Sequence, residues 1–427
     1  MANYRKRIAD GLLARKLAGM GAVLVEGAKW CGKTTTCEQF AKSALYLSDP
    51  QKHEEYLNFV SVDVHRLLAG QHPRLIDEWQ DAPQLWDAIR HEVDHLDGEG
   101  HFILTGSSVV PVDSEKKIVH SGTGRIARVK MRPMSLWESG ESTGEVSLSN
   151  LMAGEIAISA KAHSFSLAEM SYLICRGGWP KAVEQGGDIA LDRALDYYEA
   201  VTRSDISRTD GIPRDPERVK QLMRSYARLQ GTQSNLSAIR KDMQANDVRS
   251  ISEDTIYSYL TALRRIFVIE DMRAWCPSLR AKSAIRTSDT RYFTDPSIAI
   301  AALGATPGGL ANDLRSFGYF FETLAVRDLR VYMDTVMGDV GHYHDSTGLE
   351  CDVVLLARDG SYALVEIKTG GNLIDEGVAT LSKFDSLIAK KGMKPPVFRM
   401  VLTAIGEFAY TRPSDKIIIC PIGCLKP

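Results

Sequence analysis

The sequence predicts a multidomain α/β protein in which a helix-covered parallel sheet comes first, a helical segment follows and a second α/β region ends the chain. Apolar runs alternate with helical stretches up to about residue 138, which is the pattern of a parallel sheet. Residues 166–305 show helical spacing, and a hairpin pattern lies near residue 360. The 427 residues exceed one ordinary core, so we expect three domains, at residues 1–165, 166–305 and 306–427.

The composition is that of an ordinary globular protein and excludes several classes. Hydrophobic residues make up 44% and charged residues 25%, and the net charge of -2 argues against binding of polyanions by bulk charge. No run approaches the roughly 18 apolar residues of a membrane span, and the basic N-terminal segment lacks the features of a signal peptide. The 7 cysteines form no C-x-x-C pair, so we expect reduced, packed thiols. These observations predict a cytoplasmic protein without a membrane partner.

The stretch VLVEGAKWCGKTTT at residues 23–36 carries the first chemical motif. Gly27, four further residues and Gly32-Lys33-Thr34 fit the phosphate loop G-x-x-x-x-G-K-[ST], and an apolar strand precedes it as the motif requires. In such a loop the backbone amides surround the β-phosphate, the lysine bridges the β- and γ-phosphates, and the Thr34 hydroxyl holds Mg²⁺. The sequence therefore predicts a nucleotide site formed by Gly27, Ala28, Lys29, Trp30, Cys31, Gly32, Lys33, Thr34 and Thr35.

Polar residues end two later strands of the predicted sheet. Asp77 and Glu78 follow the run at residues 74–76, and Thr105 follows the run at residues 101–104. Because the carboxyl ends of parallel strands meet at one edge of a sheet, these side chains are expected beside the phosphate loop. We expect Asp77 to orient the magnesium shell, Glu78 to polarise the attacking water and Thr105 to lie near the γ-phosphate.

A glycine-containing loop, Ser121 to Arg125, leads into the last strand of this region. Arginine neutralises charge on a transferring phosphoryl group, either in cis or from a neighbouring subunit. On spacing alone, an arginine on an exposed turn is the open alternative.

Together these motifs resemble a known family. The stretches VLVEGAKWCGKTTT, RLIDEWQDAP, HFILTGSS and GTGRIARVKMRPMSLWE, in this order and spacing, look like the AAA-type ATPases of bacteria and archaea that carry a C-terminal restriction-endonuclease-like domain. Gly177–Pro180, Ser204–Ile206 and the run from Ser234 to Asp295 agree with this resemblance. It implies a P-loop ATP hydrolase of the AAA type that uses ATP and Mg²⁺, with Lys33, Asp77, Glu78 and Arg125 in catalytic roles.

The helical segment contains a pattern of helix, turn, helix and wing. Residues 235–243 and 252–267 read as two helices, and residues 268–275 read as the start of a wing. A winged helix places its second helix in a DNA groove, with Arg264, Arg265, Arg280 and Lys282 as available phosphate partners. The alternative is a spacer or a protein contact.

The C-terminal hairpin at residues 350–368 has two possible registers. A two-residue turn at Asp359-Gly360 puts Asp352 opposite Ile367, away from Glu366. A three-residue loop closed by a glycine bulge puts Asp352 opposite Glu366 and brings Lys368 to the same face. We favour the second register because it gathers the charges on one side and leaves the other side apolar.

Two carboxylates and a lysine at the edge of an apolar hairpin need a partner, and a divalent metal supplies one. Asp352 and Glu366, with the Ile367 carbonyl, are expected to ligate Mg²⁺ or Mn²⁺, while Lys368 positions or activates a water. The D-x(13)-E-x-K pattern is that of restriction-endonuclease-like nucleases. Glu322 occupies the helical position where that family often places another metal-facing carboxylate.

The leading hypothesis is an ATPase coupled to a metal-dependent nuclease domain that acts on nucleic acid, with DNA favoured over RNA. A homo-oligomer in which Arg125 meets a neighbour's nucleotide is one arrangement. The competing hypothesis is an ATP-controlled switch that binds nucleic acid or protein, in which the nuclease fold cuts nothing. The presence of Asp352, Glu366 and Lys368 together favours activity.

Overall fold

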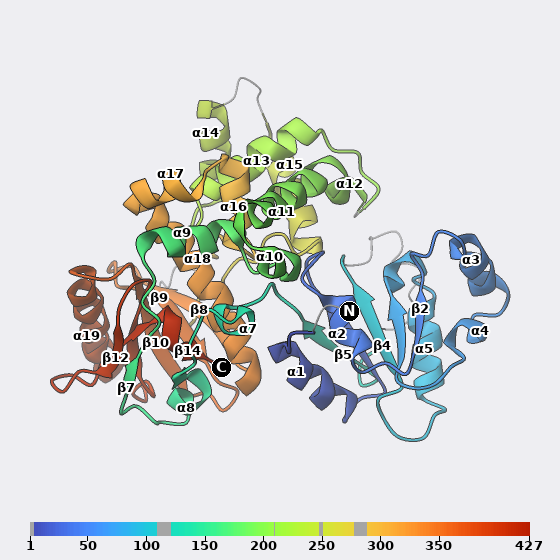
Figure 1. Cartoon of the computed structure of the whole chain (residues 1–427), viewed down its shortest axis with the longest axis horizontal. Helices are drawn as coiled ribbons and strands as arrows, with labels where there is room; N and C mark the ends of the chain where they lie inside the picture. Colours follow the sequence, from blue (N-terminus) through green and yellow to red (C-terminus); the bar gives the residue numbers. More distant parts are fainter. Residues whose placement is uncertain (1–3, 109–120, 209, 247–250, 277–287) are drawn as a thin grey trace. The chain divides into compact units, whose positions relative to one another are not determined.

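The structure is a computed structural model that describes residues 4–108, 121–208, 210–246, 251–276 and 288–427 (Figure 1). Contacts within the chain divide it into two compact units. The N-terminal unit comprises Met1–Pro133, Ala200–Pro216 and Ser258–Val268, and the C-terminal unit comprises Met134–Glu199, Glu217–Tyr257 and Ile269–Pro427. The division into three domains stays a prediction. No helix among the described residues is long and apolar enough to cross a membrane.

The N-terminal unit is built on a five-stranded parallel sheet, as predicted. The strand order is β2-β3-β4-β1-β5, and every neighbouring pair is parallel. Val23, Leu24 and Val25 of the central strand are at most 2% exposed, because helices cover both faces of a parallel sheet. The elements are α1 (Ile8–Leu17), β1 (Ala22–Glu26), α2 (Lys33–Glu38), β2 (Ser43–Tyr46), α3 (His53–Val62), α4 (His65–Leu68), β3 (Arg74–Asp77), η1 (Trp79–Asp81), α5 (Leu85–Val93), β4 (Phe102–Gly106) and β5 (Ile126–Lys130), with η2 (Val201–Asp205) and α12 (Ile206–Arg208) joining from later in the chain.

The C-terminal unit is built on a seven-stranded mixed sheet, in the order β7-β12-β13-β11-β10-β9-β8. Helix α19 (Leu373–Lys391) packs its apolar residues on one face, against Val354, Leu364 and Val401. Two strands of this unit, β6 and β7, come from before residue 165. Strand β7 pairs with β12 in the seven-stranded sheet, and β6 pairs with β14 in a separate two-stranded sheet. The strands are β6 (Val146–Ser147), β7 (Ser159–Lys161), β8 (Asp339–His344), β9 (Glu350–Leu356), β10 (Tyr362–Lys368), β11 (Arg399–Thr403), β12 (Phe408–Thr411), β13 (Ile418–Pro421) and β14 (Leu425–Lys426).

Helices dominate the segment at residues 166–305, as predicted. The two helices of the predicted winged helix are present as α14 (Leu236–Asn246) and α15 (Glu253–Arg265). Bridges at Ile269–Phe293 and Met272–Thr290 form a short antiparallel pairing after them. Arg280 and Lys282 lie outside the described residues. The other helices of the described residues are α7 (Leu136–Ser139), α8 (Leu148–Met152), α9 (Leu167–Arg176), α10 (Pro180–Gln185), α11 (Gly187–Ala200), α13 (Pro216–Arg228), α14 (Leu236–Asn246), α15 (Glu253–Arg265), α16 (Pro296–Leu303), α17 (Pro307–Asn312), α18 (Leu314–Met333), η3 (Asp334–Val336), α19 (Leu373–Lys391) and η4 (Ile422–Cys424).

A buried ionic cluster lies on the long helix α18. The Arg327 guanidinium lies 2.8 Å from Asp295 and 2.7 Å from Asp328, and the three side chains are at most 2% exposed. The same carboxylates accept backbone N–H groups of Gly178 and Leu136, each at 2.9 Å. The cluster therefore joins α18 to three segments that are distant in sequence.

We expect Arg327→Ala to lower the free energy of unfolding by about 3–5 kcal/mol, because it leaves two buried carboxylates without their cation. Urea unfolding followed by tryptophan fluorescence measures the change. Lys181→Ala is the control, since Lys181 pairs with Glu184 on an exposed face, and its loss should cost less than about 1 kcal/mol. Equal effects of the two substitutions would contradict a structural role for the cluster.

Candidate functional site

The phosphate loop connects β1 to α2 at the carboxyl edge of the N-terminal sheet. Gly32 has φ of 101° and caps α2, and a Cβ on Gly27 would lie 2.0 Å from the Met131 carbonyl oxygen. Both positions thus require glycine. The Lys33 amino group donates to the carbonyls of Gly27 and Ala28 at 3.0 and 2.9 Å. This side chain is held inside the loop, where the motif needs its charge.

Thr34, Asp77 and Thr105 meet beside this loop, as predicted. The hydroxyls of Thr34 and Thr105 donate to Asp77 Oδ1 at 2.8 and 2.5 Å. Burial raises the pKa of the Asp77 carboxyl, and these two hydrogen bonds counteract part of the shift. A hydroxyl and a carboxylate in contact are the oxygen donors that Mg²⁺ takes in a P-loop site, so these residues fit the ion.

Glu78 occupies a strained backbone position next to Asp77. Its φ of 56° lies in the left-handed region, which is uncommon for a residue with a side chain. The Ser107 hydroxyl donates to Glu78 Oε2 at 3.0 Å, and the Gln80 amide also donates to this oxygen. The carboxylate is therefore oriented by two neighbours, as a residue that polarises a water needs to be. We did not expect Gln80, whose only sequence signal is its position two residues after Glu78.

Two further side chains brace the loop. Lys29 forms an ion pair of 2.7 Å with Asp205 in the π-helical turn η2, and the Arg7 guanidinium donates to the Cys31 carbonyl at 2.8 Å. Asp205 lies 176 residues from Lys29 in sequence, so no local pattern predicts the pair. Trp30 and Thr35, both expected in the nucleotide site, are exposed at the loop and in the first turn of α2.

Arg125 does not join the other predicted catalytic residues. It precedes β5, and the β1–β5 register places Ala22 opposite Ile126 and Glu26 opposite Lys130. Arg125 thus lies at the amino edge of β1, about 16 Å from the carboxyl edge where the phosphate loop begins. There it pairs with Asp94 at 2.8 Å, and this hydrogen bond lowers the pKa of Asp94. The expectation of a role in cis is wrong, and a role in a neighbouring subunit stays a prediction.

The C-terminal hairpin adopts the favoured register. Val365 pairs with Val353 and Leu364 with Val354, which places Asp352 opposite Glu366. The turn closes through a hydrogen bond of 2.9 Å from the Ala357 N–H to the Ser361 carbonyl, and Gly360 has φ of 85°. The three-residue loop is confirmed. Val354 and Leu364 lie on the same face of the hairpin as Asp352 and Glu366, and α19 packs against these two apolar residues.

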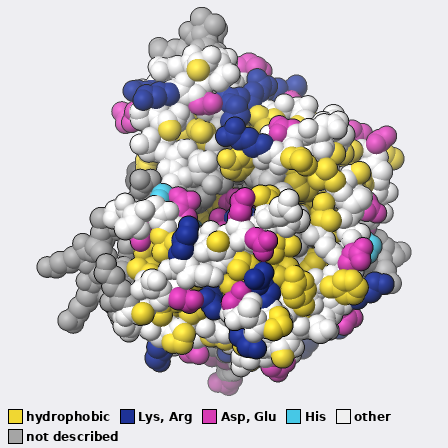
Figure 2. All heavy atoms as spheres, turned by 90° about the vertical axis from the view of Figure 1, so that its left-hand side faces the viewer, with side chains coloured by type: hydrophobic (Ala, Val, Ile, Leu, Met, Phe, Trp, Pro, Cys, Tyr) yellow, Lys and Arg dark blue, Asp and Glu magenta, His cyan; other side chains and the backbone are white. Residues whose placement is uncertain are grey.

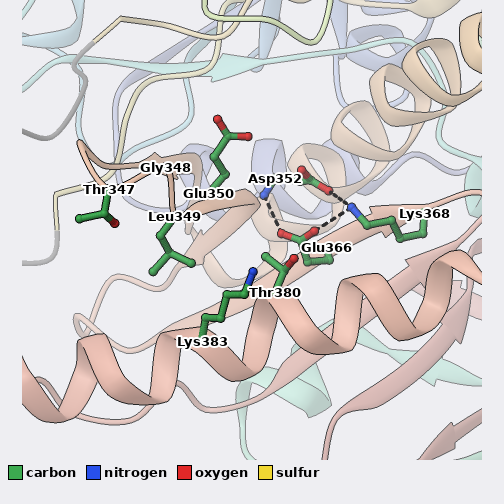
Figure 3. Close-up of a pocket in the computed structure, with 9 residues that line it drawn as sticks. All are labelled: Thr347, Gly348, Leu349, Glu350, Asp352, Glu366, Lys368, Thr380 and Lys383. Carbon is green, nitrogen blue, oxygen red and sulfur yellow. Dashed lines mark hydrogen bonds and ion pairs between the residues drawn. The ribbon is translucent and has the colours of Figure 1, made fainter.

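Asp352, Glu366 and Lys368 converge at the end of this hairpin (Figure 3). The Lys368 ammonium lies 2.7 Å from Glu366 Oε2 and 3.3 Å from Asp352 Oδ2. Asp352 Oδ2 also accepts the Ile367 N–H at 2.8 Å. Burial lowers the pKa of Lys368 and the two carboxylates raise it, with a net upward shift. The lysine is therefore a stable cation between the two acids.

Glu322 of α18 belongs to the same electrostatic group. It is half-buried and accepts a hydrogen bond from the Tyr292 hydroxyl. Burial, followed by the charge of Asp352, raises the pKa of both Glu322 and Glu366. Burial penalises the charged form of each carboxyl, and the count of one ammonium against three carboxyl groups adds to the shift.

Asp352, Glu366 and Lys368 border a pocket of about 480 Å³. Its walls come from the β8–β9 turn, from the hairpin and from α19, and the lining residues are Thr347, Gly348, Leu349, Glu350, Asp352, Glu366, Lys368, Thr380 and Lys383. Among the described residues, no group of three or more His, Cys, Asp or Glu side chains is arranged to hold a metal ion. The charged group that the pocket presents is the pair of carboxylates of Asp352 and Glu366, bridged by Lys368.

Comparisons with known proteins identify the N-terminal region. Residues 20–139 match the family described as an AAA domain, while residues 167–308 and 317–425 match two domains of unknown function, DUF8612 and DUF4143. No curated protein matches the chain. With the geometry of the phosphate loop, the first match identifies an AAA-type P-loop ATPase domain that uses ATP.

Two solved structures are similar to this chain at low identity. A Walker-type ATPase of Pyrococcus abyssi is 15% identical over 70% of this chain and 96% of that chain, with a TM-score of 0.44. The Orc1 protein of Aeropyrum pernix in complex with DNA is 12% identical over 71% of this chain and 92% of that chain, with a TM-score of 0.24.

We expect Glu78→Gln to lower the ATP hydrolysis rate about 10²- to 10⁴-fold while ATP binding is retained, because only the group that polarises the water changes. Lys33→Ala should weaken both binding and hydrolysis. Phosphate release measures the first quantity and fluorescent-nucleotide titration the second. A Glu78→Gln variant that hydrolyses ATP at the wild-type rate would assign the water to another residue.

The raised pKa of Glu366 predicts a dependence of stability on pH. The folded state holds this proton more tightly than the unfolded chain, so stability decreases as pH rises from about 4.5 through the raised pKa. Glu366→Gln removes this contribution, and its unfolding free energy should fall less over that window. Urea unfolding at a series of pH values tests this, with the exposed Glu407→Gln as control. Parallel curves for wild type and Glu366→Gln would show that Glu366 is not the group responsible.

Proposed function

We propose that this chain couples ATP hydrolysis to a metal-dependent, nuclease-like site that acts on nucleic acid. The convergence of Asp352, Glu366 and Lys368 at the end of one hairpin supports the proposal. A buried core does not tolerate such a group without a function or full neutralisation. One lysine faces three carboxyl groups here, since Glu322 adds a further one, and the raised pKa values of Glu322 and Glu366 offset part of the negative charge.

The donor set fits Mg²⁺ or Mn²⁺. The ammonium of Lys368 touches both carboxylates, which shows that a single cation can contact Asp352 and Glu366 at once. These two residues would hold the metal. When bound, the metal supplies charge stabilisation at the phosphodiester and activates a water. Lys368 is then the group of this chain that donates hydrogen bonds to the attacking water or to the scissile phosphate.

The ATPase half of the proposal uses the N-terminal site. Lys33 and Thr34 hold the nucleotide and its Mg²⁺, and Glu78 polarises the water that attacks the γ-phosphate. Arg125 is too far from its own phosphate loop to act there, so a catalytic role for it requires a homo-oligomer in which it reaches a neighbour's nucleotide. ATP hydrolysis would then depend on assembly, which is a route by which the ATPase controls the C-terminal site.

A second candidate function is an ATP-controlled binding switch whose C-terminal site cuts nothing. The observation that favours it is the double ion pair of Lys368, which already neutralises Asp352 and Glu366 in part without any metal. In this case the site is a binding surface for nucleic acid or protein, and the carboxylates serve only to fix the lysine.

A cleavage assay separates the two functions. Plasmid DNA, linear duplex, single-stranded DNA and RNA are incubated with Mg²⁺ or Mn²⁺, with and without ATP, while phosphate release is followed in parallel. Wild type is compared with Lys33→Ala, Glu366→Ala and the exposed control Glu407→Ala. We expect Glu366→Ala to lose cleavage and keep ATP hydrolysis, because Glu366 belongs to the C-terminal site and not to the nucleotide site.

The response of cleavage to Lys33→Ala reports whether ATP drives the reaction. If no substrate is cut by wild type while phosphate release continues, the nuclease proposal fails and the binding switch is retained. If Glu366→Ala and Glu407→Ala cut equally well, the assigned residues are wrong.

A further inference from the structure

An unpaired lysine lies on the helical wall of the C-terminal pocket. Lys383 is one turn from Thr380 on α19, and both residues line the pocket. Figure 3 shows the Lys383 side chain pointing from α19 toward the hairpin that carries Asp352 and Glu366. Within the part of the chain that the structure describes, Lys383 makes no hydrogen bond or ion pair, whereas Lys368 is engaged by two carboxylates. Lys383 is therefore the cation of this pocket that is available to a ligand.

An exposed aromatic ring lies on α18, one helical turn from Glu322. Tyr319 precedes Glu322 by three residues, so the two side chains share one face of the helix. Both flank Gly231: a Cβ at that position would lie 3.3 Å from Tyr319 Cδ1 and 3.4 Å from each Glu322 carboxylate oxygen. The tyrosine is nevertheless 38% exposed. Part of the side chain lies against Gly231, and more than a third of the residue is exposed to solvent.

We propose that the C-terminal site binds single-stranded nucleic acid, with Tyr319 stacking on an unpaired base and Lys383 pairing with a backbone phosphate. The inference rests on the proposed function, because it names the substrate class of the same site. The cation in the pocket wall and the ring on the helix that carries Glu322 match the two recurring parts of a nucleic-acid strand, which are the phosphate and the base face.

Two features favour a single strand over a duplex. The faces of paired bases are stacked and hidden, so an aromatic platform is useful only for unpaired bases. A duplex is held mainly by many basic side chains along its backbone. Figure 2, however, shows basic and acidic side chains mixed on the face that carries α14, α17 and α19. Local contacts at the pocket suit the binding of a short single-stranded segment.

The test is binding without cleavage. Fluorescence anisotropy is measured in EDTA, so that no probe is cleaved and the result does not depend on whether the site is a nuclease. The labelled probes are a 12-nucleotide single-stranded DNA, the matching RNA and the matching DNA duplex. The variants are Tyr319→Ala, Tyr319→Phe and Lys383→Ala. The matched controls are Tyr410→Ala, whose side chain is 42% exposed on β12, and Lys161→Ala on β7.

We expect Tyr319→Ala to weaken single-strand binding about 5- to 150-fold, as the loss of one stacked base implies. Tyr319→Phe should bind like wild type because it keeps the ring. Lys383→Ala should lower the slope of log affinity against log salt by about 0.7, the value for one phosphate contact on a single strand. Both control variants should bind like wild type, and the DNA and RNA arms show which sugar the site accepts.

Three results overturn the proposal, and they are distinguishable. If wild type binds single strands but Tyr319→Ala binds as tightly, the ring is not a stacking platform. If the duplex binds as tightly as the single strand and loses as much affinity in Tyr319→Ala, the substrate class is wrong. If wild type binds none of the three oligonucleotides, the action on nucleic acid in the proposed function fails as well. Thermal unfolding of each variant confirms that the loss of binding is not a loss of fold.

Discussion

The ion cluster of Arg327, Asp295 and Asp328 is the constraint on which the C-terminal unit depends. A buried guanidinium between two carboxylates has a strict geometry, and each carboxylate also accepts a backbone N–H from another segment. The position of α18 is thereby fixed against the turn at Gly178 and the start of α7. Glu322 lies five residues from Arg327 on the same helix, roughly 7.5 Å along its axis. The cluster therefore sets where Glu322 and Tyr319 stand relative to the hairpin, and substitutions there should disturb the pocket without touching it.

The two sites of the chain treat charge differently. In the nucleotide site, Lys33 points at loop carbonyls and Asp77 is satisfied by two hydroxyls, so the protein alone satisfies the hydrogen-bonding groups that a nucleotide and Mg²⁺ would later contact. In the C-terminal site, three carboxyl groups face the single ammonium of Lys368, and the excess negative charge is relieved by raised pKa values. In the proposed function a divalent metal would take the place of these protons, since it offers the same carboxylates more charge than a proton does.

Local patterns predicted what local geometry determines. The glycine and lysine spacing located the phosphate loop, the apolar run before Asp77 placed that residue at a strand end, and turn parity gave the correct hairpin register. Features that depend on chain-wide pairing were not predictable from such patterns. Lys29 meets Asp205 across 176 residues, and β7 joins the far sheet instead of the one nearest in sequence. The error over Arg125 has the same origin: a loop motif shows which residue is exposed, but only the β1–β5 register shows at which sheet edge it lies.

The surface of α15 bears on where nucleic acid would contact the chain. A winged helix uses the start of its second helix in a DNA groove, yet α15 begins with Glu253 and Asp254, and Glu253 already pairs with Arg240 at 3.4 Å. Carboxylates at that end repel phosphates, and they also interact favourably with the helix dipole, so their role there is to stabilise the helix. The basic residues Arg264 and Arg265 lie at its other end. A contact through α15 would thus lack cations where the groove-binding geometry needs them. The C-terminal pocket has the unpaired Lys383 in its wall, and the exposed ring of Tyr319 lies one helical turn from Glu322 on α18, which makes this region the better-supported contact for a phosphodiester chain.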